Sequence, residues 1–314
     1  MKIVLLGAGS HSQGNHLPSL ARYAREHAGE IELAGLCDLR REHAEAMAAQ
    51  YGFARAFSEL DTMLREVQPQ GCVAVTPIST TREIAARAIE ARVPLLMEKP
   101  PGATLAEARQ IVELVRQSGA LVMVSMNRRF DPALRVALEW WGDRPLRYVR
   151  GTIVRVDRRE PDFFYGTAIH PLDALREIAG DVREFSVAER LDDEVRWNTV
   201  HLDFERGAAG TLEVLPTAGS MGEFYELYGP GCRALVRAGG PDTGEVRCWE
   251  DGQLVVDKNP ALGEPEYVRN GTYAETTAFI GALSGSRPMH PTPAEVLQSV
   301  ELCERIEQGA VGRM

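Results

Sequence analysis

The chain has 314 residues, a length that corresponds to about two domains. Hydrophobic residues make up 44% and charged residues 25% of it, which is typical of a folded globular protein and excludes a disordered one. With 35 basic and 45 acidic residues the net charge is −10, which disfavours contact with a phosphate backbone, so we expect no nucleic-acid partner.

Membrane and export signals are not recognisable in the sequence. No apolar run approaches the roughly 18 residues of a membrane span, and the first residues lack the pattern of a signal peptide. The five cysteines are scattered without a CxxC pair, so neither a disulfide framework nor a thiolate zinc site is suggested. We expect a cytoplasmic protein without a membrane partner.

The first 125 residues alternate short apolar runs with stretches of helical period. This alternation predicts β-α units, in which a parallel sheet carries helices on both faces. The expected strands are 3–6, 31–37, 54–57, 72–75, 94–97 and 121–124. The expected helices are 17–28, 41–51, 59–66, 80–91 and 104–118. We therefore expect a dinucleotide-binding domain over residues 1–125.

From residue 126 the pattern changes to longer strands of alternating character. The expected strands are 146–156, 197–204, 211–215 and several within 223–256. The expected helices are 132–141, 171–178, 273–283 and 293–308. Gly-Ala-Ala-Gly at 207–210 separates two strands as a hairpin turn would. We expect an α/β domain with a mostly antiparallel sheet over residues 126–314, whose last helices are free to pack on the first domain.

The junction after the first predicted strand has the composition of a nucleotide-binding turn. It reads Gly7-Ala8-Gly9-Ser10-His11-Ser12. Glycines here let the backbone approach a pyrophosphate, and the N-terminus of the next helix attracts an anion. Ser12 stands where the usual pattern has its third glycine, so a plain strand-to-helix turn is the alternative. Asp38, which ends the second strand, can bind an adenosine ribose and favours the nucleotide site.

The same region bears on the choice of nucleotide. Asp38 favours NAD because its charge disfavours a 2′-phosphate. Arg40 and Arg41 follow it, and they could bind that phosphate or simply be solvated at a helix start. We expect NAD as the cofactor, with NADP as the alternative.

Lys99 follows an apolar strand in the sequence Glu98-Lys99-Pro100, and open α/β sheets bind ligands at the carboxyl ends of their strands. Of the 35 basic residues, only Lys2, Lys99 and Lys258 are lysines. Lysine differs from arginine because it can lose its proton when it is desolvated. Lys99 is therefore our candidate for proton transfer, and a salt bridge to Glu98 or to another partner is the alternative.

A second polar cluster opens a predicted helix with His170-Pro171-Leu172-Asp173. The histidine and the aspartate are three residues apart, so both can point into one cleft and serve substrate binding or proton transfer. Helix capping and core packing are the alternatives. Because no HExxH or CxxC pattern accompanies them, we expect no metal. Arg128 could bind a substrate anion or form an interdomain ion pair, and Tyr165 ends segment 162–165, a candidate substrate-covering loop.

These motifs stand in the order and spacing of the Gfo/Idh/MocA oxidoreductases, which the chain resembles along nearly its whole length. The motifs that carry the resemblance are GAGSHSQGNHLP at 7–18, Cys37-Asp38, Thr76-Pro77, Glu98-Lys99-Pro100, Met126-Asn127-Arg128-Arg129-Phe130 and His170-Pro171-Leu172-Asp173. The resemblance implies a Rossmann domain that holds NAD or NADP. It also implies a C-terminal α/β domain with an open sheet, which forms the substrate site and the oligomer interface.

The resemblance further implies roles for individual residues. Lys99 and His170 would face the nicotinamide and the reacting hydroxyl as catalytic residues. The substrate-binding residues would be Asp173, Arg128 and Tyr165. The cofactor-binding residues would be Gly7, Gly9, Ser10, His11, Ser12, Asp38, Arg40, Thr76, Pro77, Glu98, Lys99 and Asn127.

Two positions depart from the family pattern. The glycine loop is one residue longer between Gly9 and His16, and the family's common aspartate four residues before the histidine is Gly166 here. Because of the second change, only Lys99 and His170 remain of the family's lysine, aspartate and histidine. This loss puts the usual sugar dehydrogenase chemistry in question, although Lys99 can still serve.

We expect an NAD(P)-dependent oxidoreductase that acts on a carbon–oxygen centre of a sugar, polyol or related small molecule. The first alternative is a non-redox elimination or glycoside cleavage with tightly held NAD. The second is a cofactor-binding regulator without turnover, which the glycine at position 166 favours and Lys99 disfavours. Because strands from Leu146 onward carry apolar residues on their outer face, we also expect a homo-oligomer, either a dimer or a tetramer.

Overall fold

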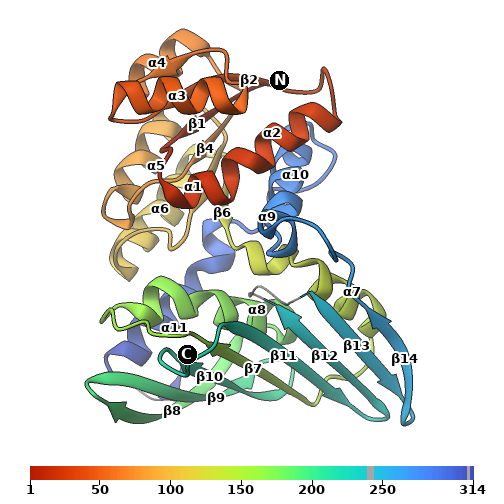
Figure 1. The fold of residues 1–314 in the computed structure, drawn as a ribbon. Helices are drawn as coiled ribbons and strands as arrows, with labels where there is room; N and C mark the ends of the chain where they lie inside the picture. The colour runs from red at the N-terminus through yellow and green to blue at the C-terminus, as the bar shows by residue number, and fades with distance from the viewer. Residues whose placement is uncertain (239–243, 310–311) are drawn as a thin grey trace. The chain divides into compact units, whose positions relative to one another are not determined.

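The protein is described by a computed structural model that covers residues 1–238, 244–309 and 312–314. The chain forms two compact units (Figure 1). The first unit comprises Met1–Ser125 and Thr272–Leu297, and the second comprises Met126–Gly271 and Gln298–Met314. Each unit is built around a sheet of its own.

The sheet of the first unit has six strands, and every neighbouring pair is parallel. The strand order is β3-β2-β1-β4-β5-β6. The strands are β1 (Lys2–Leu6), β2 (Glu32–Cys37), β3 (Ala56–Phe57), β4 (Gly71–Ala74), β5 (Leu95–Glu98) and β6 (Val122–Ser125). Their residues are almost all buried, which explains why they appear in the sequence as short continuous apolar runs. The predicted parallel sheet is confirmed.

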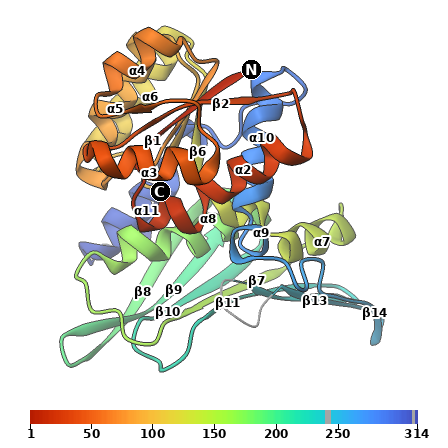
Figure 2. The ribbon, with the colours of Figure 1, turned by 45° about the horizontal axis from the view of Figure 1, so that its top comes forward.

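Helices cover both faces of this sheet (Figure 2). They are α1 (Ser10–Gly14), α2 (His16–Glu26), α3 (Arg41–Tyr51), α4 (Leu60–Val67), η1 (Ile78–Thr80), α5 (Thr81–Glu90), α6 (Leu105–Ser118) and α10 (Thr272–Leu283). The capping signal of α6 is confirmed, because the Thr104 side chain accepts a hydrogen bond from the Glu107 amide at 3.2 Å. The short helix α1 was not predicted.

Helix α10 joins the first unit although it lies more than a hundred residues beyond β6. It packs on α2, where the guanidinium of Arg22 lies 4.9 Å from the ring centroid of Tyr273. It also packs on the start of β4. A Cβ at Gly71 would lie 2.5 Å from a Leu283 methyl and 3.3 Å from the ring of Phe279, so β4 begins with a residue that has no side chain.

The second unit holds a nine-stranded sheet in the order β14-β13-β12-β11-β7-β10-β9-β8-β15. The strands are β7 (Tyr148–Val154), β8 (Val182–Asp192), β9 (Val195–Phe204), β10 (Ala209–Leu215), β11 (Gly222–Gly229), β12 (Cys232–Ala238), β13 (Glu245–Glu250), β14 (Gln253–Lys258) and β15 (Gly312–Arg313). Among the described strands of this second sheet, only the β7–β10 pair is parallel. The prediction of a mostly antiparallel sheet and of the β9–β10 hairpin is confirmed.

One face of this sheet is buried beneath helix α8 (Ile169–Ala179), and alternate residues on the other face stay partly exposed. The backbone of β7 comes close to α8, since a Cβ at Gly151 would lie 3.1 Å from Leu175. The other helical segments are η2 (Asn127–Phe130), α7 (Pro132–Trp141), the π-helical η3 (Phe164–Ala168), α9 (Glu266–Arg269) and α11 (Pro293–Glu307). Within the described part of the chain, no helix has the length and apolar character to cross a bilayer.

Candidate functional site

The order of strands in the first unit creates a place for a ligand between β1 and β4. From β1 the chain proceeds outward to β2 and β3, whereas β4, β5 and β6 lie on the other side. In open α/β sheets such a reversal leaves a crevice at the carboxyl ends of the two central strands. The predicted glycine loop follows β1, and Thr76 and Pro77 follow β4, so both predicted segments lie at that edge of the sheet.

Glycine occupies positions 7 and 9 for different structural reasons. Gly7 has a φ of +90°, and a Cβ there would lie 2.0 Å from the carbonyl oxygen of Val75, so only glycine fits. Gly9 has an ordinary extended conformation, and a Cβ there would meet no atom within 4 Å. The empty space beside Gly9 allows a ligand to approach the backbone closely.

The residues after Gly9 form a helical turn and not the open loop that we expected. Ser10, His11 and Ser12 lie in α1. Ser12, at the place of the usual third glycine, is fully buried, and its hydroxyl has no hydrogen-bond partner among the described residues. A buried hydroxyl in this state lacks the partner that such groups normally have. The space at Gly9 and the hydroxyl of Ser12 both fit a bound dinucleotide.

Asp38 directly follows β2 and holds the backbone of the glycine turn. Its Oδ2 accepts a hydrogen bond from the Ala8 amide at 3.0 Å, and its Oδ1 accepts from the amide and the Nε of Arg40 at 3.1 and 3.2 Å. Burial raises the pKa of Asp38, but the hydrogen bonds from Arg40 and Ala8 outweigh burial and lower it. The carboxylate is therefore ionised, and Arg40 is its ion-pair partner.

A second carboxylate, Glu98, lies at the end of β5 between two histidines of the glycine turn. Its Oε1 is 3.1 Å from Nε2 of His11 and 2.6 Å from Nε2 of His16, and its Oε2 accepts a hydrogen bond from the Lys99 amide at 3.2 Å. Burial raises the pKa of Glu98, but the bonds from His11 and His16 hold it well below its usual value. Three such ligand atoms could hold a metal ion, but the hydrogen bonds account for their arrangement.

Lys99 is half-buried directly after β5 and precedes a cis peptide bond to Pro100. It stands at the carboxyl end of a parallel strand, the edge where such sheets bind ligands. Its neighbour Glu98 is engaged by the histidines. The sequence did not indicate that His16 contributes to this group, because an isolated histidine after a glycine turn carries no signal of its partner.

In the second unit a buried carboxylate binds two arginines. Glu223 of β11 is fully buried and accepts two hydrogen bonds from Arg128, at 2.6 and 2.7 Å, and one from Arg155 at 2.6 Å. Tyr225 donates its hydroxyl to the same carboxylate at 3.2 Å. Burial raises the pKa of Glu223, but the charges of Arg128, Arg155 and His170 hold it far below its usual value.

His170 is therefore near enough to this cluster to act on Glu223 electrostatically. The predicted residues His170 and Arg128 are brought together in this way, through Glu223. Sequence analysis missed Arg155, Glu223 and Tyr225. They lie on or beside strands whose pairing brings together positions about 70 residues apart, and the sequence gives no signal of that pairing.

Asp173 occupies a different environment from the cleft that we expected. It is 1% exposed, accepts hydrogen bonds from Arg129 at 2.7 and 2.9 Å, and accepts another from the Ser299 hydroxyl at 2.8 Å. This ion pair joins η2, α8 and α11. The substrate contact of Asp173 stays a prediction that the ion pair does not support. Asn127, at the start of η2, is also buried.

The segment expected as a loop over the substrate is instead helical and buried. A turn leads into η3, and the side chains of Phe163, Phe164 and Tyr165 are all buried. The amide of Tyr165 donates to Glu307 at 2.8 Å. The expectation of an open loop is wrong, because these aromatic rings supply core packing. At Gly166, a Cβ would meet only an oxygen of Asp162 at 3.9 Å, so packing does not require glycine there.

Comparison with known proteins agrees with this organisation. Residues 1–126 match a model described as an oxidoreductase family with an NAD-binding Rossmann fold. D-apiose dehydrogenase from Paraburkholderia graminis is 25% identical over 291 residues, which cover 88% of this chain and 72% of the relative. A dehydrogenase structure (MviM) from Clostridium difficile superimposes with a TM-score of 0.86 at 18% identity, covering 99% of both chains.

A levoglucosan dehydrogenase in complex with NADH and L-sorbose superimposes with a TM-score of 0.84 at 18% identity, covering 99% of this chain and 96% of that one. The two structural matches show a common fold. The family match confirms the Rossmann fold of the first unit, the expected cofactor NAD and the assignment to the oxidoreductases.

Proposed function

Because the chain belongs to the Gfo/Idh/MocA oxidoreductase family, we propose that it transfers a hydride between NAD and a carbon–oxygen centre of a sugar, polyol or sugar-derived molecule. The observation that carries the proposal is Lys99, a lysine at the carboxyl end of β5 beside a carboxylate engaged by two histidines. The D-apiose dehydrogenase relative supports the substrate class.

The residues of the first unit hold the cofactor in this proposal. Gly9 leaves the backbone of the turn accessible, and Gly7 lets it pass close to Val75. When NAD is bound, Ser10, His11 and Ser12 would contact its phosphates and Asp38 would bind its adenosine ribose. Arg40, Thr76, Pro77 and Glu98 complete the proposed set in this unit, and Asn127 of the second unit is a further predicted contact. When bound, NAD accepts or supplies the hydride at its nicotinamide ring.

Lys99 moves the proton of the reacting hydroxyl. In the oxidative direction its neutral amine takes that proton, and in the reductive direction its ammonium returns it. His170 orients the oxygen or relays the proton. Arg128 and Tyr165 are the proposed substrate contacts, and we assign Asp173 the role of holding Arg129 in addition to its predicted contact. Proton transfer of this kind contributes roughly 100-fold to 10,000-fold to the rate.

We further propose that copies of the chain associate through the open face of the nine-stranded sheet and that the protein works in the cytoplasm. Tyr148, Leu254 and Val255 expose between 36% and 48% of their surface, and Tyr148 and Tyr228 border a hollow on the outer face of β7 and β11. Exposed apolar residues of this kind are typical of contact surfaces. Light scattering at micromolar concentration tests association, and a particle of 34.6 kDa would contradict it.

The test of the activity starts with mass spectrometry of any ligand that co-purifies with the protein. A panel of sugars and polyols is then assayed with NAD and with NADP, and formation of the reduced nucleotide is followed by absorbance. We expect net reduction of NAD with at least one compound. Conversion of a substrate without net reduction would favour elimination or glycoside cleavage, and binding without turnover would favour a regulator.

A further inference from the structure

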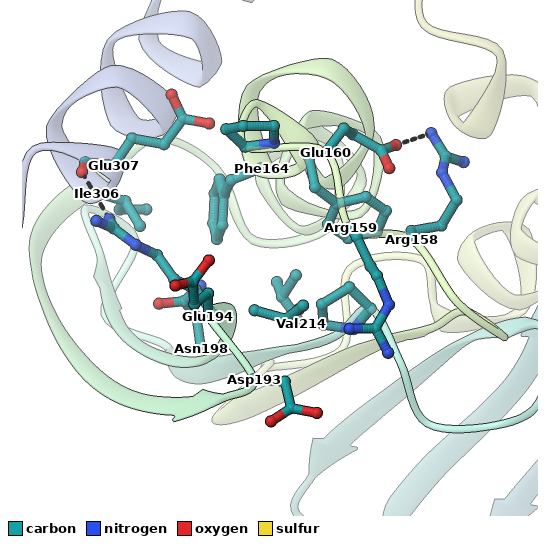
Figure 3. Close-up of a pocket in the computed structure, with 15 residues that line it drawn as sticks. Arg158, Arg159, Glu160, Phe164, Asp193, Glu194, Asn198, Val214, Ile306 and Glu307 are labelled. Carbon is teal, nitrogen blue, oxygen red and sulfur yellow. Dashed lines mark hydrogen bonds and ion pairs between the residues drawn. The ribbon is translucent and has the colours of Figure 1, made fainter.

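A cavity of about 650 Å³ lies in the second unit, apart from the residues assigned to the chemistry (Figure 3). It is lined from the segment before η3, the β8–β9 turn, strands β9 and β10, and the end of α11. Neither His170 nor Glu223 lines it. Its volume is within the range of small-molecule sites, so it has room for a sugar or a small glycoside.

Asn198 is the unusual residue of this cavity. On β9 it stands at a buried position in line with Val200 and Leu202, which belong to the core. Its side chain is 7% exposed, lines the cavity, and forms no hydrogen bond with any residue that the structure describes. An amide carries two donors and an accepting oxygen, and in Asn198 these groups remain available to a molecule in the cavity. A ligand with hydroxyl groups would satisfy them.

An apolar surface accompanies the amide. Phe164, Val214 and Ile306 line the cavity, and each is at least 95% buried (Figure 3). A sugar ring has C–H groups as well as hydroxyls, and these side chains offer contacts for the C–H groups. The cavity therefore combines an apolar wall with a polar group that can both donate and accept.

The charges around the cavity disfavour an anionic ligand. Three guanidinium groups and four carboxylates line it. Each arginine already has a carboxylate nearby: Arg158 pairs with Glu160, Arg159 with Asp157 at 2.6 Å, and Arg196 with Glu189 at 3.6 Å. A phosphate or carboxylate would therefore find no uncompensated positive charge, whereas these groups can donate to and accept from neutral hydroxyls.

We propose that this cavity binds one neutral sugar or polyol unit, with Asn198 as its central hydrogen-bonding group. Glu307 contributes to the same wall. One of its oxygens accepts a hydrogen bond from the Tyr165 amide, while the other can accept from a ligand hydroxyl. Such a site goes beyond the proposed oxidoreductase activity, because it binds a sugar through residues that take no part in the hydride transfer.

Binding of neutral probes to the 314-residue chain without cofactor tests the proposal. Saturation-transfer-difference NMR is recorded with methyl α-D-glucopyranoside, D-xylose, myo-inositol and cellobiose, and with D-glucose 6-phosphate as the anionic comparison. We expect at least one neutral probe to bind, and Asn198→Leu to weaken its affinity tenfold or more. The matched control is Asp203→Asn, an exposed position on the same strand, which should leave the affinity unchanged.

Two further variants separate this site from the catalytic residues. Lys99→Met should leave binding of the neutral probe unchanged. If the protein proves not to be a dehydrogenase, the binding result therefore still tests this cavity independently. Asn198→Asp keeps the size of the side chain and removes its donors, so it should also weaken binding. It replaces Asn198→Leu as the test if that variant does not fold. The proposal is overturned if no neutral probe binds, if glucose 6-phosphate binds more tightly, or if folded Asn198 variants bind as the parent does.

Discussion

Glu98 in the first unit and Glu223 in the second are both buried carboxylates with a pKa far below the usual value, but their partners differ. Glu98 is bound by the imidazole rings of His11 and His16, whose nitrogens can each donate or accept a hydrogen bond. Glu223 is bound by Arg128 and Arg155, which stay charged at any pH the protein meets.

This difference indicates that the Glu223 cluster serves the stability of the fold, whereas the Glu98 cluster lies beside the proposed chemistry. A carboxylate held by arginines is a fixed part of the structure, because none of its partners releases a proton. Glu98 is held by rings that can also accept hydrogen bonds, and it is adjacent in sequence to Lys99, the proposed proton carrier. We therefore expect changes at Glu223 to affect stability most, and changes beside Glu98 to affect turnover most.

The largest effect is expected for Glu223→Gln. Removing this charge leaves Arg128 and Arg155 buried without a counter-charge, and breaking such a pair from one side costs about 3–5 kcal/mol. Urea denaturation measures the loss in the free energy of unfolding. The control is Glu250→Gln, which removes an exposed ion pair with Arg144 and should cost about 1 kcal/mol or less. Equal losses for the two variants would contradict the role given to Glu223.

Lys99→Met tests the other side of the comparison. Methionine keeps the length and apolar packing of the stem and removes the amine, so turnover should fall on the order of 100-fold or more while nucleotide affinity stays nearly unchanged. Steady-state kinetics and a nucleotide titration measure the two quantities. Lys258→Met, at the end of β14, is the matched control. If Lys99→Met turned over within a few-fold of the parent, His170 or a water would have to be the base.

Asp131 provides a third buried carboxylate for the comparison. It is influenced by the charges of Arg128 and Glu223, but its own pKa is raised and not lowered. Burial raises its pKa to about 6, although hydrogen bonds from the amides of Leu134 and Ala133 and the charge of Arg128 oppose this. Its folded pKa is above its unfolded one. The stabilising contribution of the protonated form is therefore complete below about pH 4 and is lost as the pH rises through about 6.

Asp131→Asn, which stays neutral, should gain stability relative to the parent over that pH range, by on the order of 2 kcal/mol. Thermal or urea unfolding of both proteins between pH 4 and pH 7 measures the difference. A constant difference across this range would show that Asp131 keeps an ordinary pKa.

Much of the fold could be predicted because its signals are local. Helix α7 begins and ends where expected, since Asp131 caps it through two backbone amides and Pro132 occupies its first turn. Strand β8 was missed because most of its residues are polar and exposed, so neither an apolar run nor a clear alternation marks it. Its pairing with β9 makes it a strand.

The candidate site also contains residues that local sequence signals predict and residues that they do not. Gly7, Asp38 and Lys99 follow strands directly, so their place at the edge of the first sheet could be inferred from the chain alone. The ion pair of Asp173 with Arg129, and the cluster around Glu223, depend on which helix or strand lies beside which. A residue's position in the sequence does not determine that neighbour.

The smallest effect concerns the nucleotide. Arg40 already pairs with Asp38, and Arg41 pairs with Glu45 at 2.7 Å, so neither cation is uncompensated for a 2′-phosphate. NAD should bind about tenfold more tightly than NADP, roughly 1.4 kcal/mol. Titration calorimetry measures both affinities, and Asp38→Ala should reduce the preference. Tighter binding of NADP to the parent would show that Arg40 or Arg41 controls the choice.

The last part of the chain completes both units, since residues 272–297 supply α10 to the first and β15 pairs with β8 in the second. During synthesis the first 125 residues emerge early, but the surface of β4 at Gly71 is covered by Leu283 and Phe279 of α10 as well as by Ile3. The first unit is therefore complete only after α10, which follows the strands β7–β14 in the chain, has been synthesised. A chain that ended before α10 would leave this apolar surface without Leu283 and Phe279, and exposed apolar surface of this kind favours aggregation.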